Sequence, residues 1–173
     1  MQIQIASPDD LGFIEGAYDH ARAFMQANGN TTQWPSGYPG RVDAEKDIAH
    51  GHCFLVTDEA GPLAVFSFGP GPDKTYAEID GAWHSDADYH VIHRVAAVRG
   101  NGVARAIFTF AAEHADYLRC DTHENNVPMR RALSSFGFRE CGTITVANGT
   151  QRVTYDWLKE PLDGGAPASP TTR

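Results

Sequence analysis

The spacing of hydrophobic and polar positions divides the first part of the chain into a strand and two helices. Residues 2–6 alternate polar and apolar side chains and predict a strand. Residues 7–10 read Ser-Pro-Asp-Asp, with a capping serine, a proline and first-turn acids, so a helix should begin there and run to about residue 28. A turn-rich stretch over residues 29–41 follows, and Asp43 should cap a short helix ending near residue 50.

The middle of the chain has β-type patterns. Residues 53–57 and 63–68 predict a hairpin, because the turn residues at 58–62 separate two runs of apolar and aromatic side chains. Residues 76–79 and 89–97 predict two more antiparallel strands, joined by a loop over residues 80–88.

Helices and strands alternate in the last third. Apolar residues recur at helical spacing over residues 103–115 and predict a helix packed on a sheet, followed by a strand over residues 117–121. Val127 and Pro128 begin another helix, which should end before Gly137.

The C-terminal part of this pattern is a hairpin over residues 138–146 and 152–158, across Asn148-Gly149. Residues 160–173 lack apolar anchors, and we expect a disordered tail there. Residues 1–159 should therefore form a single domain.

Composition excludes several classes of protein. With 42% hydrophobic residues the chain can bury an ordinary core, and it has neither a membrane-length apolar run nor an N-terminal leader pattern. We therefore expect a cytoplasmic protein without a membrane partner. Three cysteines without paired spacing indicate neither a disulfide framework nor a metal site.

The net charge of −8 is unevenly distributed. Residues 1–93 carry four Lys and Arg against fourteen Asp and Glu, whereas residues 94–139 carry seven Arg against four acids. An acidic chain repels nucleic acid, so we expect no nucleic-acid partner. The basic segment nevertheless favours a local anion site.

The most informative motif, Arg99-Gly100-Asn101-Gly102-Val103-Ala104, lies between an apolar run and a predicted helix. Glycine lets the backbone approach a ligand, and the first amides of a helix point outward at the positive end of its dipole, which predicts a phosphate-binding turn. The motif lacks the Gly-Lys-Ser/Thr ending of a P-loop, and Arg105 replaces the third glycine of a dinucleotide fingerprint.

Arg99, Gly102 and Ala104 fit the Arg/Gln-x-x-Gly-x-Gly/Ala signature, and Asn126 is followed by Gly137 and Phe138. In both elements the sequence resembles the GNAT superfamily of acyl-CoA N-acyltransferases. The resemblance implies an α/β fold of the α+β type: a mixed, mostly antiparallel central sheet of about six to seven strands, flanked by about four helices.

The resemblance also implies an N-acetyltransferase that uses acetyl-CoA as acyl donor and an amine as acceptor, without a metal. It places the coenzyme on the following residues: Val95, Ala96, Ala97, Arg99, Gly100, Asn101, Gly102, Val103, Ala104, Arg105, Asn126 and Arg130. The backbone N–H groups near Val95 to Ala97 would hold the oxyanion.

Direct transfer to an amine needs a base, because an amine such as lysine is protonated at neutral pH. Val95 matches the family position that contacts the acetyl arm, which places His93 at the base position; a strand histidine without catalytic duty is the equal alternative. Strand alternation should put His93 and Val95 on one face and Arg94 on the other. Glu78 could relay the proton, or it could be an ordinary solvated carboxylate.

Aromatic residues in loops favour a binding surface. Trp34, Tyr38 and Trp83, with His84 beside the last, predict the acceptor pocket, although a tryptophan that anchors the loop is the competing interpretation. The acidic first 93 residues favour a small cationic amine or a positively charged peptide end as acceptor.

The chain departs from the family pattern in two ways. Only Val98 separates Ala97 from Arg99, where relatives have about three further residues, and Leu133 replaces the tyrosine that often protonates the leaving thiolate. Ser134, Tyr155 or water could supply that proton. An inactive acyl-CoA-binding module with the same fold is therefore the alternative function, and a homodimer is compatible with either.

Overall fold

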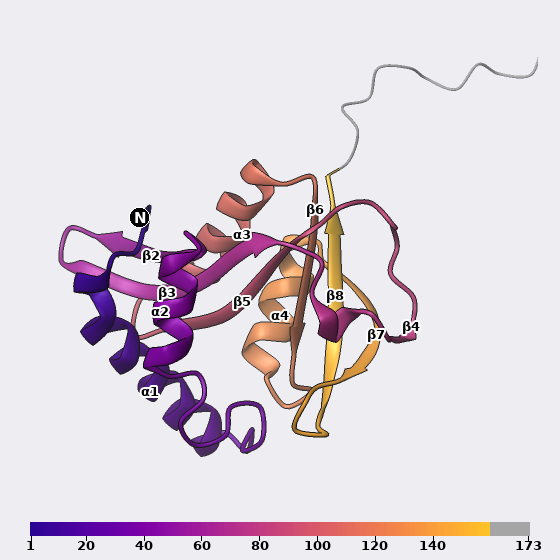
Figure 1. Cartoon of the computed structure of the whole chain (residues 1–173), viewed down its shortest axis with the longest axis horizontal. Coiled ribbons are helices and arrows are strands. Elements are labelled where there is room, and N and C mark those ends of the chain that lie inside the picture. Colours follow the sequence, from indigo (N-terminus) through magenta and orange to yellow (C-terminus); the bar gives the residue numbers. More distant parts are fainter. Residues whose placement is uncertain (160–173) are drawn as a thin grey trace, which may run out of the picture.

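A computed structural model describes residues 1–159 as strands and helices around one large sheet (Figure 1). The tail predicted for residues 160–173 lies outside the described residues. The helical elements are η1 (Pro8–Asp10), α1 (Leu11–Ala27), α2 (Arg41–Ala49), η2 (Lys74–Tyr76), α3 (Val103–His114) and α4 (Val127–Phe136). The strands are β1 (Gln2–Ile5), β2 (Cys53–Asp58), β3 (Gly61–Pro70), β4 (Asp80–Gly81), β5 (His90–Ala97), β6 (Tyr117–Thr122), β7 (Arg139–Thr145) and β8 (Gln151–Leu158).

The eight strands form one mixed sheet in the order β1-β2-β3-β5-β6-β8-β7-β4. Neighbouring strands are antiparallel except β5 and β6, which run parallel. The predicted fold class is confirmed, with one or two strands more than expected. None of the helices within residues 1–159 has both the length and the apolarity needed to span a bilayer.

The prediction of a strand over residues 76–79 is wrong. Residues 74–76 form the short helix η2, and Asp80–Gly81, inside the predicted loop, form β4 at the far edge of the sheet beside β7. The side chain of Asp73 caps η2 by accepting from the backbone N–H of Thr75, a local bond that competes with strand pairing. β4 can lie this close to β7 because residue 81 is a glycine. A Cβ at that position would collide with the β7 backbone.

Two apolar layers sandwich the sheet. Ile107 and Phe108 of α3 and Leu133 of α4 pack on one face of the sheet. Ile14 of α1 and Ala44 of α2 pack on the other face. The amphipathic spacing of α3 therefore produces the packing that it predicts.

β5 pairs with β6 along only the first part of its length. β5 pairs with β6 only from His90 to Ile92, whereas it continues along β3 as far as Ala97. The strand carries a bulge, because Arg94 and Val95 both lie opposite the single residue Phe66 and the register with β3 shifts there. Arg94 takes a positive φ of 51°, the only non-glycine residue within 1–159 to do so. The two parallel strands consequently diverge beyond Ile92.

Candidate active site

A cavity of about 1230 Å³ opens where β5 and β6 diverge. Its walls come from α1, from the loop between α1 and α2, from β5 and the turn after it, from the end of β6 with the start of α4, and from the β7–β8 turn. Cofactor sites in α/β proteins commonly lie where neighbouring parallel strands separate, since the backbone and helix N-termini there are free to meet a ligand. This cavity is therefore the candidate site.

The glycine turn forms one end of this cavity. Arg99, Gly100, Asn101 and Ala104 line it, and α3 begins at Val103 directly after the turn. Gly100 and Gly102 have φ values of 98° and 80°, a backbone conformation that favours glycine. The turn thus presents the N-terminus of a twelve-residue helix at the cavity, as anion binding requires.

Arg99 is held at the rim by Asp58 of the β2–β3 hairpin. Its two terminal nitrogens donate to the two carboxylate oxygens of Asp58, each at 3.0 Å. The hydrogen bond from Arg99 lowers the pKa of Asp58, although both groups are exposed. A surface ion pair therefore orients the guanidinium. Because such a pair is weak, phosphate oxygens can replace the carboxylate of Asp58 as the partner of Arg99.

The other predicted coenzyme residues divide into two groups. Val95, Ala97 and Asn126 line the cavity, and Asn126 also caps α4 by accepting from the backbone N–H of Met129 at 3.4 Å. The remaining ones lie outside its walls: Ala96 and Val103 are buried in the core, Gly102 and Arg105 line a separate shallow depression, and Arg130 donates to the hydroxyl of Tyr155 at 2.9 Å.

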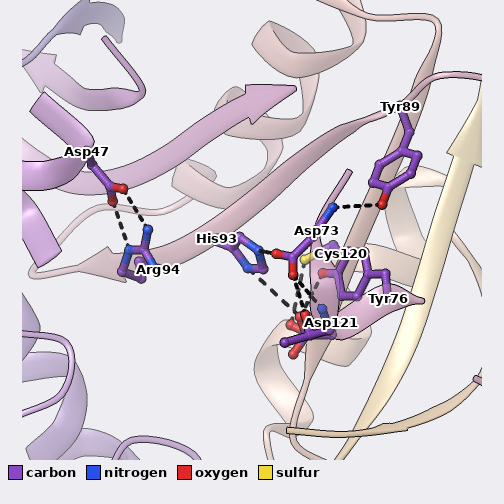
Figure 2. Close-up of polar contacts among 9 residues, drawn as sticks. Asp47, Asp73, Tyr76, Tyr89, His93, Arg94, Cys120 and Asp121 are labelled. Atoms are coloured by element: carbon purple, nitrogen blue, oxygen red, sulfur yellow. Dashed lines mark hydrogen bonds and ion pairs between the residues drawn. The ribbon is translucent and has the colours of Figure 1, made fainter. Parts of the chain in front are cut away.

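His93 lies in the cavity wall with a carboxylate on each side. Its Nε2 is 2.7 Å from Oδ2 of Asp73, in the loop after β3, and its Nδ1 is 3.9 Å from Oδ1 of Asp121, at the end of β6 (Figure 2). The hydrogen bond with His93, aided by those from Thr75, holds the pKa of Asp73 well below its usual value, against the opposing effect of burial. Asp73 is consequently ionised, and it fixes the imidazole ring with the proton on Nε2.

Asp121 is itself held by Tyr76 of η2. The Tyr76 hydroxyl donates to Oδ1 of Asp121 at 2.7 Å. Burial, together with the charge of Asp121, raises the pKa of Tyr76 well above its usual value, so this hydroxyl keeps its proton. The short helix η2 and its capping residue, which the sequence pattern did not predict, therefore bring Tyr76 and Asp73 to His93.

The bulge in β5 separates the side chains of neighbouring residues. Figure 2 shows His93 pointing toward Asp73 while Arg94 points the other way, to Asp47 of α2. Arg94 donates to both oxygens of Asp47, at 2.8 and 2.7 Å, and both side chains are largely buried. This pair fixes the bulged backbone. His93, Arg94 and Val95 all contribute to the cavity wall, so the strict alternation predicted for this strand is not kept at the bulge.

Two of the four predicted acceptor residues lie in the cavity and two do not. Trp34 and Tyr38 line it, and Trp34 is also anchored edge-on to Tyr18 at a ring distance of 5.9 Å. Trp83 instead covers the guanidinium of Arg119 at 4.1 Å from its ring centroid. His84 bonds Oδ1 of Asp156 through Nδ1 at 2.8 Å.

Glu78 and the predicted thiolate acids also lie away from the cavity. Glu78 is exposed and lines no part of it. Leu133 is fully buried in the core, and neither Ser134 nor Tyr155 lines the cavity. His84, Cys141 and Asp156 do place one potential metal ligand each within 4.8 Å of one another, outside the cavity.

Sequence reasoning missed Asp73, Asp121, Gln33 and Arg152, which line the cavity. Asp73 lies in a Gly-Pro-rich connection without periodicity, and Arg152 reads as an ordinary strand residue. The one available signal was position, because Asp121 ends the predicted strand that pairs parallel with the strand of His93.

The cavity, the helix-terminal turn and the divergent parallel strands have the form of a site for a coenzyme that carries phosphate groups, as in acyl-coenzyme transferases. No protein-family sequence model and no curated protein matches the chain. Among solved structures, an acetyltransferase of the GNAT family from Streptococcus agalactiae is 30% identical over 92% of this chain and 96% of its own, with a TM-score of 0.84.

More distant structures show the same fold. A GNAT-family acetyltransferase from Listeria monocytogenes is 20% identical over 91% of this chain and 94% of its own, with a TM-score of 0.68. An aminoglycoside acetyltransferase solved with coenzyme A and kanamycin is 15% identical over 91% of this chain and 94% of its own, with a TM-score of 0.60. The chain belongs to the GNAT family and is an acetyl-CoA-dependent acyltransferase.

Proposed function

We propose that the protein transfers an acetyl group from acetyl-CoA to a primary amine by direct attack. The observation that carries this proposal is the 2.7 Å contact between His93 Nε2 and Asp73 Oδ2 inside the cavity that the phosphate turn closes. An amine acceptor must lose a proton before attack, and an oriented imidazole is the side chain best suited to take it near neutral pH.

His93 Nδ1 is the basic atom in this mechanism. Ionised Asp73 accepts the Nε2 proton, which leaves the lone pair on Nδ1 free to receive a proton from the amine. When Nδ1 is protonated, the imidazolium lies between the carboxylates of Asp73 and Asp121. Both carboxylates therefore favour proton transfer toward His93.

Nδ1 of His93 first takes one proton from the ammonium group, and the neutral amine nitrogen then attacks the thioester carbonyl carbon. A C–N bond forms, and the carbonyl oxygen becomes an oxyanion that β5 backbone N–H groups near Val95 to Ala97 would hold, where β6 no longer pairs with β5. The tetrahedral intermediate then collapses, the C–S bond breaks, and the thiolate of coenzyme A leaves. The second amine proton passes to the departing thiolate or to water as the intermediate collapses. A thiol pKa of about 8.5 permits departure without a protein acid.

The acetyl-CoA phosphates would lie at the Arg99 to Ala104 turn, with Asn126 and the cavity face of Val95 along the pantetheine arm. Trp34 and Tyr38, in the loop between α1 and α2, would face the acceptor. A cationic acceptor amine is supported by Asp73 and Asp121, whose charges attract an ammonium group to the base. Glu78, Trp83, His84 and Arg130 have no role in this mechanism.

The test is release of free coenzyme A from acetyl-CoA with a panel of primary amines, with mass spectrometry of the product. We expect an N-acetyl product with at least one amine, and a fall in kcat of about 100-fold or more in His93→Ala, since general-base catalysis contributes about 10²–10⁴-fold. His20→Ala is the matched control, because it removes another histidine of the cavity wall. Tight coenzyme binding with no transfer to any amine would instead establish the inactive binding module.

A further inference from the structure

Arg152, near the start of β8, is a buried cation that lines the cavity. Only 5% of the residue is exposed. Its Nη1 donates to the hydroxyl of Thr150 at 2.7 Å and to the carbonyl of Gln151 at 2.9 Å. Its Nη2 donates to the carbonyl of Gln33, in the loop between α1 and α2, at 2.8 Å.

All of these partners are neutral. Within residues 1–159, no carboxylate lies within 4 Å of the Arg152 guanidinium, whereas Arg94 and Arg99 each bond both oxygens of an aspartate. A guanidinium has five N–H donors, and the three bonds leave two of them without a partner in this part of the chain. Burying a charged group without a counter-ion is unfavourable unless a ligand supplies one.

The surroundings keep this cation available. Burial lowers the pKa of Arg152, and the charge of Asp121 opposes that effect. Asp121 is the carboxylate of the cavity that influences Arg152, but its Oδ1 already accepts from Tyr76 and faces Nδ1 of His93. The fold thus places a buried guanidinium and the proposed base in the same cavity, and no carboxylate of the described residues pairs with the guanidinium.

Arg152 lies on the acceptor side of the cavity. β6 separates β8 from β5 in the sheet, so Arg152 is across β6 from the strand that leads into the phosphate turn. Its contact with Gln33 ties it to the loop that carries Trp34 and Tyr38. The neighbour of Arg152, Val153, pairs with Thr122, directly after Asp121.

We propose that Arg152 binds a carboxylate of the acceptor, so that the acceptor is an amine that also carries a carboxylate, as in an amino acid. This proposal rests on the proposed acetyl transfer to an amine. The ammonium end would meet Asp73 and Asp121 beside His93, and the carboxylate end would take the two remaining N–H groups of Arg152. Arginine suits this task because its planar donors match the two oxygens of a carboxylate.

The first test uses the unaltered protein with pairs of acceptors that differ in one group. α-Amino acids and ω-amino acids of increasing length are each compared with their primary amides. For at least one pair we expect kcat/KM to be about tenfold or more higher for the acid, since a hydrogen-bonded charge pair discriminates by at least that factor. The amide has the less basic amine and is thus the better nucleophile at neutral pH, so this preference cannot come from amine reactivity.

The second test uses Arg152→Gln, with Arg152→Lys to retain the charge. Gln should lower kcat/KM for the preferred acid about tenfold or more, mainly through the acceptor KM, and leave the KM for acetyl-CoA unchanged; Lys should restore part of the loss. Arg131→Gln, at an exposed position of α4 that lines no part of the cavity, is the control.

The results of these two tests separate the carboxylate site from the proposed acetyl transfer. Transfer to amines with every amide at least as good as its acid would overturn the carboxylate site while leaving the acetyltransferase intact. A raised KM for acetyl-CoA in Arg152→Gln would assign the arginine to a coenzyme phosphate instead and overturn the proposal. If Gln disrupts folding, the acid-to-amide ratio of Arg152→Lys, which we expect to fall, decides in its place. Absence of transfer to any amine would overturn the proposed function itself, and the acceptor site with it.

Discussion

Replacing Asp73 with asparagine tests the geometry around His93. The substitution keeps the size of the side chain and removes the charge that accepts from His93 Nε2 at 2.7 Å. The new amide can also donate to Nε2, which would move the ring proton to Nδ1, the atom that must be free in the proposed mechanism. Asp73 is a positioning residue, so its loss should act through His93.

The size of the effect follows from the contact. A hydrogen bond to a charged group contributes about 1.5–3 kcal/mol. The side chains of His93 and Asp73 are 29% and 25% exposed, so solvent weakens their interaction and the lower half of that range applies. Asp73→Asn should therefore lower kcat by roughly 10- to 40-fold, at about 1.4 kcal/mol per factor of ten.

The assay is kcat and the KM for acetyl-CoA, measured by release of coenzyme A. Asp73 acts through the orientation of His93, so the loss should fall on kcat and leave the KM for acetyl-CoA unchanged. Asp116→Asn, in an exposed pair with Lys159, is the control for loss of one negative charge. A variant with unchanged kcat would refute the positioning role of Asp73.

Asp73→Asn should also change the free energy of unfolding, and the lowered pKa of Asp73 determines how this change depends on pH. The pKa of Asp73 is lower in the folded protein than its unfolded value of about 3.9, so its stabilising contribution is complete above that pH. The contribution is lost as pH falls through the folded pKa. Urea unfolding should therefore show the protein and Asp73→Asn converging in strong acid and differing most near neutral pH, if the variant changes nothing else.

Three further predictions concern the phosphate turn, the bulge and a buried thiol. Gly102→Val should raise the Kd for acetyl-CoA about tenfold or more, because a β-branched residue at a φ of 80° is strained, whereas Gly102→Asn should bind nearly normally; equal affinities by calorimetry would contradict the turn assignment. Asp47→Asn should destabilise the fold by about 3 kcal/mol in urea unfolding, since it leaves Arg94 buried without its ion pair, and a loss below about 1 kcal/mol would show the pair to be dispensable. Burial raises the pKa of the Cys53 thiol to about 12, so iodoacetamide at pH 8 should leave it unmodified until urea unfolds the protein; rapid labelling in the folded state, by peptide mapping, would count against the core assignment.

The local part of this protein follows from its sequence. Apolar spacing predicts α3 and β6 almost to their ends, and glycines at 100 and 102 predict a turn that only a positive φ allows. These features depend on residues a few positions apart, so a single segment contains the information. The same local resemblance led to the family, which the solved relative confirms.

The contacts within the candidate site could be identified only from the tertiary structure. His93 and Asp73 are 20 residues apart, and they meet because η2 replaces a strand that the pattern at 76–79 favours. Arg152 and Gln33 are 119 residues apart, and they meet because β8 lies next to β6 in the sheet. The separation of β5 from β6, which opens the cavity, depends on where pairing stops and on a bulge at Arg94.

The sequence by itself determined the helices, most strands and the glycine turn before α3, because hydrogen bonds and side-chain spacing within one segment specify them. Only the tertiary structure decided which carboxylates flank His93 and where a buried arginine, Arg152, has no counter-ion among residues 1–159. Such contacts depend on strand order and register, which are set by the packing of the whole sheet between its two helical layers.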